Sequence, residues 1–177
     1  MRIAAAVAAG LFVVMTALSA RGGAPRINDF TTDPVDPPAY RRVLEQAPNQ
    51  GRDMSYPATF AAIQATCCAD LAPERTALPP ALALAAARAA ASQMKDWEIL
   101  ASDEATGSLE AVATTRLFGF KDDVVVRLRP DGAGSRIDVR SKSRDGKGDM
   151  GANAQRIRNY MAALRLELAK PRPGLQP

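Results

Sequence analysis

The chain contains no histidine among its 177 residues. This absence excludes serine–histidine triads, histidine general bases and histidine metal ligands. Chemistry by carboxylate, serine or lysine side chains is not excluded. The sequence therefore favours a protein that is not an enzyme, with a carboxylate-based enzyme as the alternative.

Cysteines and aromatic residues are also scarce. The two cysteines, Cys67 and Cys68, are adjacent, and aromatic residues make up 5% of the chain. Two thiols cannot complete a four-ligand zinc site, and we expect no metal and no cofactor. The thiols are either two small unpaired residues, a vicinal disulfide or an intermolecular link.

The first twenty residues resemble a targeting segment. Met1 and Arg2 form a short positive start, residues 3–18 are apolar apart from Thr16, and small residues follow at Ser19 and Ala20. This pattern predicts a cleaved signal peptide or an uncleaved N-terminal anchor. In both cases we expect an exported protein, either periplasmic or anchored in the inner membrane and facing the periplasm. Membrane proximity follows, and nucleic acid is not an expected partner.

The remaining chain predicts a proline-rich lead over residues 21–48 and one α+β domain over residues 49–170. Alternating apolar residues between positions 97 and 142 predict an antiparallel meander of about four to five strands. Residues 70–78 read as an edge strand. Helices are predicted over residues 81–94 and from about residue 149, and we expect both to pack on one face of the sheet. Ile27 and Phe30 are candidates for pinning the lead to the domain.

Positive charge is local. Residues 116–165 contain twelve Lys or Arg and six Asp, a net charge of +6, against +4 for the whole chain. Residues two apart on a strand share a face, so we expect a cationic sheet face that looks outward, with Glu110 and Asp138 as possible internal counter-ions. The alternative is a solvated face that only maintains solubility. The anion-binding candidates are Arg116, Arg127, Arg129, Arg136, Arg140, Arg144, Asn153 and Arg156.

Two loop regions complete the candidates. The turn FGFKDD contains Phe118, Phe120, Lys121, Asp122 and Asp123. Its phenylalanines either close the end of the core or form an exposed contact with a charged rim. At the start of the last helix, the group to test as a pocket is Ser141, Ser143, Arg144, Asp149, Asn153 and Arg156, with Asp149 as a helix cap.

Four stretches carry a family resemblance: RINDFTTDP at residues 26–34, Gln64 with the Asp70–Pro73 stretch, TTRLFGFKDDVVVRLRP at 114–130, and SRIDVRSKSRDGKGDMGANAQRIRNY at 135–160. Together they resemble the bacterial domain of unknown function 1499 family from about residue 25 to 165. The resemblance implies an exported or envelope-associated domain without a named substrate. This chain departs from the family where Cys68-Ala69-Asp70 replaces an aromatic–proline–aspartate stretch.

Three functions follow as hypotheses. The first is a non-catalytic module that binds an anionic lipid, an anionic glycan or an acidic envelope protein through the cationic face. The second is a carboxylate-based enzyme using Asp122, Asp123 or Asp149. The third is a structural subunit that docks to an envelope complex through Phe118 and Phe120.

Overall fold

The computed structural model describes residues 26–172, which form an α+β fold around one antiparallel sheet. Strands β3 (Trp97–Asp103), β4 (Ser108–Thr114), β5 (Lys121–Asp131) and β6 (Gly134–Ser143) make the predicted meander. Two short strands, β1 (Asp29–Thr31) and β2 (Glu74–Thr76), pair with successive stretches of the free edge of β6. The α+β class and the antiparallel meander are therefore confirmed, with six strands in place of four to five.

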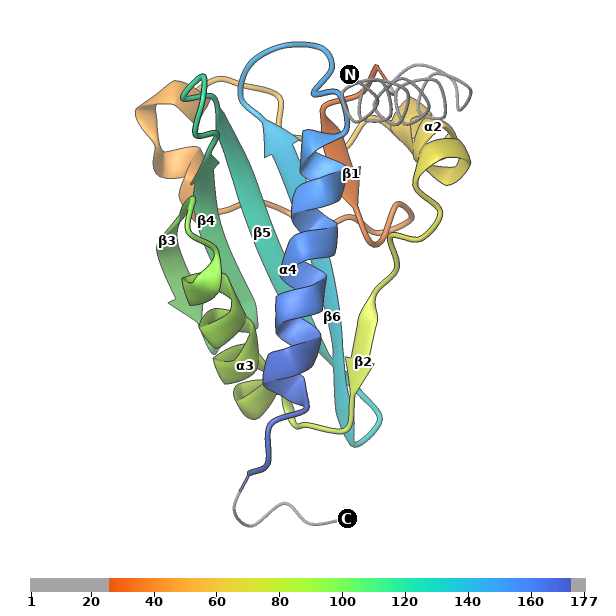
Figure 1. Cartoon of the computed structure of the whole chain (residues 1–177), viewed down its shortest axis with the longest axis vertical. Helices are drawn as coiled ribbons and strands as arrows, with labels where there is room; N and C mark the ends of the chain where they lie inside the picture. The colour runs from red at the N-terminus through yellow and green to blue at the C-terminus, as the bar shows by residue number, and fades with distance from the viewer. Residues whose placement is uncertain (1–25, 173–177) are drawn as a thin grey trace, which may run out of the picture.

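Helices α3 (Pro80–Gln93) and α4 (Ala152–Leu168) lie side by side in front of the sheet in Figure 1. Pro80 occupies the first turn of α3, where its missing N–H costs no helical hydrogen bond. The predicted alternation holds, because the inward residues of β4, β5 and β6 join both helices in one core. Its members include Leu109, Val124, Val126, Leu128, Ile137, Val139, Ala87, Ala90, Ile157 and Tyr160.

The proline-rich lead covers the other face of the sheet. Ile27 and Phe30 are fully buried in the core on the helix side, so they pin the start of the lead as expected, and Tyr40 and Val43 pack against Val125 on the other face. After β1 the chain passes behind the sheet (Figure 1) and forms the 3-10 turns η1 (Arg42–Glu45) and η2 (Ala47–Asn49). The buried Glu110 carboxylate of β4 accepts backbone N–H bonds from Arg41, Arg42 and Val43 at 3.0–3.1 Å. The start of η1 is therefore anchored to the sheet.

Helix α2 (Ala58–Cys67) completes the edge of the sheet. The Gln64 side chain accepts a hydrogen bond from the Thr31 N–H at 3.0 Å and donates one to the Thr31 carbonyl at 2.6 Å. The N–H and the carbonyl of Thr31, in the short strand β1, are therefore both satisfied by one buried side-chain amide. Among residues 26–172, no helix combines the length and apolar character needed to cross a bilayer.

Candidate functional site at the loop end of the sheet

The expected open cationic face is wrong, because the lead supplies carboxylates to it. Asp33 lies 3.4, 3.2 and 2.6 Å from the guanidinium groups of Arg127, Arg129 and Arg136. The buried Asp138 carboxylate contacts the same three arginines at 3.0–3.1 Å. Asp36 closes the cluster from outside, and the neighbouring Arg127 and Arg129 lower its pKa. Three arginines are therefore balanced by three aspartates.

Arg140 is the most deeply buried of the arginines that were expected to bind anions. Its side chain is 3% exposed and donates to both oxygens of Asp29, at 2.9 and 2.7 Å. It also donates to the carbonyls of Pro38 and Met54 and lies over the ring of Tyr40 at 4.8 Å. A guanidinium held in this way by protein groups has little capacity left for an external anion.

Asp122 and Asp123, predicted as loop contacts, are both buried, on opposite sides of β5. Asp122 faces the helices and contacts Arg156 at 2.5 Å. Asp123 faces the lead and contacts Arg144 at 2.6 Å. The expectation of an exposed acidic rim is wrong for this pair, because neighbouring residues of a strand point to opposite faces and both faces are covered here.

The predicted group at the start of α4 does come together, apart from Arg144. Asn153 is its centre: its Oδ1 contacts the Ser141 hydroxyl at 2.5 Å and accepts from Arg156 at 2.6 Å, and its Nδ2 donates to Ser143 at 2.8 Å. Asp149 accepts from the backbone N–H groups of Gly151 and Asn153, both at 2.8 Å. The N-cap residue is Gly151, so Asp149 caps the helix start from two residues before it, and its burial raises its pKa.

Ser143 and Asp149 of this network, together with Asp122, line a cavity of about 350 Å³ between two loops. We call residues 115–121, which are the β4–β5 loop and the first residue of β5, and the β6–α4 loop, residues 144–151, together the loop end. Both loops lie past the ends of the strands, at the top of Figure 1. Residues from both loops line the cavity: Thr115, Phe120, Lys121, Asp145, Gly146, Gly148, Asp149 and Met150.

Large apolar side chains are exposed at the loop end. Leu117 is 81% exposed, Phe118 69%, Phe120 54% and Met150 87%. The rings of Phe118 and Phe120 stack on each other with centroids 5.6 Å apart. Closure of the core by these phenylalanines is therefore wrong, and the exposed-contact alternative describes their position. A cluster of exposed apolar side chains marks an interaction surface.

The unpaired cations lie in the same place. Of the twelve Lys and Arg residues between positions 116 and 165, nine lie within 4.0 Å of a carboxylate. The other three, Arg116, Lys121 and Lys147, are exposed and have no such partner among residues 26–172. All three belong to the loop end. The only exposed carboxylate within these two loops is Asp145.

Met150 also has an unfavourable backbone. Its φ is +53°, in the left-handed region that residues other than glycine and asparagine rarely adopt. The adjacent Gly151, at φ +84°, shares this region without a steric penalty. A methionine that is both strained and exposed contributes little to folding, and residues of this kind cluster at binding sites.

The sequence analysis missed Leu117, Lys147 and Met150. The stretch RDGKGDMGAN does contain a signal, since Met150 is an isolated apolar residue among turn formers. In a loop of this composition a lone large apolar residue has no neighbours with which to form a core, so exposure is the simpler expectation.

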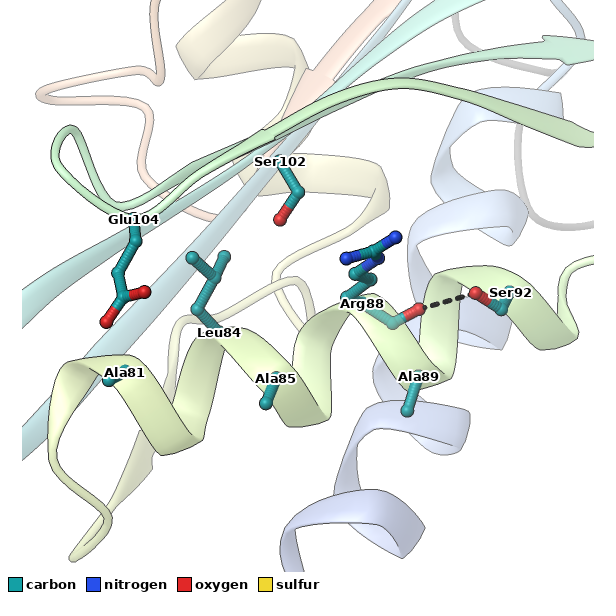
Figure 2. Close-up of a pocket in the computed structure, with 8 residues that line it drawn as sticks. All are labelled: Ala81, Leu84, Ala85, Arg88, Ala89, Ser92, Ser102 and Glu104. Carbon is teal, nitrogen blue, oxygen red and sulfur yellow. Dashed lines mark hydrogen bonds between the residues drawn. The ribbon is translucent and has the colours of Figure 1, made fainter.

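A second hollow lies between α3 and β3 (Figure 2). Its volume is about 440 Å³, and one wall is built from alanines of α3 with Leu84 and Arg88, facing Ser102 and Glu104. The Ser92 hydroxyl donates to the Arg88 carbonyl at 3.0 Å, so it is satisfied within the helix. The small side chains give this groove few groups with which to recognise a ligand. No three Cys, Asp or Glu side chains within residues 26–172 are arranged to hold a metal ion.

The fold and the loop end together define an α+β domain with an internally neutralised sheet face and an apolar, cationic end. Residues 29–164 match the family described as Protein of unknown function (DUF1499). The chain belongs to this family, as its motifs predicted. No curated protein matches the chain.

Three solved structures show a distant likeness to this chain. Ara h 8.0201 is 16% identical with a TM-score of 0.40, over 55% of this chain and 95% of its own. CV1439 from Chromobacterium violaceum is 10% identical with a TM-score of 0.36, over 56% and 96%. TTHA0849 from Thermus thermophilus is 12% identical with a TM-score of 0.33, over 55% and 94%. These values are too low to carry an argument about this chain.

Proposed function

We propose that the protein is an exported, non-catalytic module that docks on an anionic lipid surface through its loop end. The observation that carries this proposal is the coincidence of two features. The unpaired cations of the segment 116–165 lie beside the exposed side chains of Leu117, Phe118, Phe120 and Met150. Apolar side chains that enter the interface, ringed by Lys and Arg at headgroup level, are the usual arrangement of surface-bound proteins.

The place where the described chain begins supports a membrane as the occupant. The Ile27 carbonyl accepts from the Asp149 N–H at 3.3 Å, and the Asn28 side chain donates to the Gly146 carbonyl at 2.6 Å. The described chain therefore starts at the loop end. Eight residues separate this point from the apolar segment 3–18, and they span at most about 30 Å. An anchored chain would hold the loop end close to the bilayer.

The expected energies suit reversible docking. Burying one large apolar side chain contributes about 1.5–3 kcal/mol when the transfer is complete. Each Lys or Arg near an anionic surface adds about 1 kcal/mol, and salt screens this part. Since no single residue dominates the binding free energy, the affinity should fall in steps as apolar and cationic side chains of the loop end are removed.

Vesicle sedimentation tests the proposal. All strands and both hydrophobic clusters lie within residues 26–172, so a chain of residues 21–177 keeps the described fold without the apolar segment. We expect it to bind vesicles of equal parts phosphatidylglycerol and phosphatidylcholine, to release them as salt rises, and to ignore pure phosphatidylcholine. The double variant Lys121→Ser, Lys147→Ser should lose roughly tenfold or more in affinity.

The matched control is Arg88→Ser. Arg88 is an exposed cation on α3 with no carboxylate within 4.0 Å among residues 26–172, and it lies outside the loop end. Because Arg88→Ser removes one charge, it is compared with the single variant Lys121→Ser, and binding that falls equally in these two would reduce the effect to net charge and refute a loop-end site. Absence of vesicle binding, with loop-end crosslinks to an envelope protein instead, would favour the structural-subunit hypothesis.

One observation favours the carboxylate enzyme as a second candidate. Asp149 lines the cavity and has a raised pKa, as an acid–base residue requires. However, its two oxygens already accept three hydrogen bonds, from the Gly151 N–H and from the backbone and side chain of Asn153. Proton transfer at Asp149 would have to break the helix cap, so this candidate stands behind the docking module.

A further inference from the structure

The cysteine pair lies where two thiols can react with each other and with a partner. Cys67 is the last residue of α2 and is exposed, whereas Cys68 follows the helix and is 5% exposed. Their Sγ atoms are in contact at 2.7 Å. One sulfur is therefore open to an incoming disulfide, and the second stands next to the first and is shielded from solvent.

The end of a helix is a suitable place for such a pair. Cys68 has left helical geometry, with φ −145° and ψ 40°. Its N–H still bonds the Gln64 carbonyl at 2.8 Å, and its own carbonyl accepts from Leu71 at 3.1 Å. A change at the peptide bond between the two cysteines would therefore affect the last hydrogen bond of α2, from Cys68 to Gln64, and leave those of the earlier turns intact.

Covalent geometry predicts that a bond between these sulfurs is easily reduced. Neighbouring Cα atoms are about 3.8 Å apart, whereas disulfides usually join Cα atoms about 4.4–6.8 Å apart. Strained, exposed disulfides have more oxidising potentials than structural ones and are labile. A bond at this position would therefore exchange electrons readily and would add little to stability, because it closes almost no chain.

We propose that Cys67 and Cys68 form a thiol–disulfide exchange site whose oxidant is a disulfide-bearing partner. The Cys67 thiolate attacks the partner disulfide, forming a mixed disulfide and releasing one partner thiolate. The Cys68 thiolate then attacks the Cys67 sulfur, which forms the vicinal disulfide and releases the second partner thiolate. Two electrons pass to the partner, and the two cysteine protons are balanced by protonation of its thiolates.

The order of attack follows from exposure. Cys67 is accessible and Cys68 is not, so the partner reaches Cys67 first. Partial burial of its sulfur and the neighbouring Cys68 raise the pKa of the Cys67 thiol to about 12. Because the thiolate is the nucleophile, the rate of the first step should rise about tenfold per pH unit between neutral and mildly alkaline pH.

Mass spectrometry with glutathione disulfide as the probe tests the site. No Lys or Arg lies between Arg52 and Arg75, so trypsin releases both cysteines in the single peptide of residues 53–75. After glutathione disulfide treatment of the full chain and alkylation without reduction, we expect this peptide to have lost two hydrogens and to carry no alkyl group. Mild reduction before alkylation should restore two labels.

Single variants separate the steps. Cys68→Ser should stop at one glutathione on Cys67, because the resolving thiol is gone, whereas Cys67→Ser should remain largely unmodified, because Cys68 is buried. Two alkylated cysteines in the treated wild-type chain, or a disulfide-linked dimer of it, would overturn the proposal. The wild-type measurement decides on its own if a variant does not fold.

Discussion

Met150→Asn should raise stability and weaken lipid binding at the same time. Most losses of function by mutation are accompanied by a loss of stability, so opposite signs are diagnostic of a residue retained for binding. Met150 has the two features that produce this outcome: a left-handed backbone and a side chain that is 87% exposed.

The stability gain can be estimated from the backbone. A left-handed conformation costs an ordinary residue roughly 1–2 kcal/mol, and asparagine adopts it more readily because its short side chain bonds locally. Little packing is lost, since Met150 is largely in solvent. We expect the free energy of unfolding to rise by about 1 kcal/mol, which for a chain of this size raises Tm by roughly 2–4 °C.

The binding loss can be estimated from exposure. Full burial of a methionine side chain is worth about 1.5–3 kcal/mol, and most of this one is available to enter a lipid interface. Replacing it with a polar amide should cost about 1.5 kcal/mol, or roughly tenfold in affinity for phosphatidylglycerol-containing vesicles. Thermal unfolding and vesicle sedimentation of one preparation measure both quantities.

Leu166→Ala is the matched control. Leu166 is 70% exposed on the last turns of α4, at the opposite end of the molecule from the loop end (Figure 1). Its removal should leave vesicle binding unchanged. The reasoning fails if Met150→Asn lowers Tm, if its vesicle affinity is unchanged, or if Leu166→Ala weakens binding as much.

Three further changes test the interior. Asp138→Asn removes the fully buried carboxylate shared by three arginines and should lower the free energy of unfolding in urea by about 3 kcal/mol; a loss below about 1 kcal/mol would show that Asp33 and Asp36 suffice. Glu110→Gln weakens the acceptor of three N–H groups and should expose the lead to limited proteolysis before the sheet unfolds. For Asp149, burial raises the pKa above 3.8, so its charged form opposes folding at neutral pH and this cost fades as pH falls through the folded pKa. The stability of Asp149→Asn relative to wild type should therefore be greatest near pH 7 and shrink towards pH 4, and a difference that grows on acidification would contradict this sign.

The sequence predicted what depends on neighbouring residues. Val124, Val126 and Leu128 point to the helices and Arg127 and Arg129 point away, because strand alternation is a local property. The alanine-rich helix α3 begins and ends within one residue of its predicted bounds, because proline and alanine preferences are local as well.

The carboxylates that pair with the arginines of the sheet could not be predicted from local residue patterns. Asp33 and Arg136 meet across 103 residues of chain, and Asp29 and Arg140 across 111. Nothing in residue spacing brings these pairs together. The proline-rich composition of the lead does not indicate this role. Asp33 and Asp36 contact the arginines, and Tyr40 and Val43 pack against Val125, so the lead is the second cover of the sheet.

This long-range pairing also explains where free charge remains. A net charge of +6 over residues 116–165 states an excess but not its location. Carboxylates from the first half of the chain, Asp29, Asp33, Asp36, Asp70 and Glu74, meet the arginines of the sheet and of α4. Pairing there leaves the excess on the two loops, where no carboxylate among residues 26–48 lies within 4.0 Å of Arg116, Lys121 or Lys147. A protein that needed a cationic sheet face would not place three aspartates on it, whereas one that docks by its end gains from a neutral body and a charged, apolar tip.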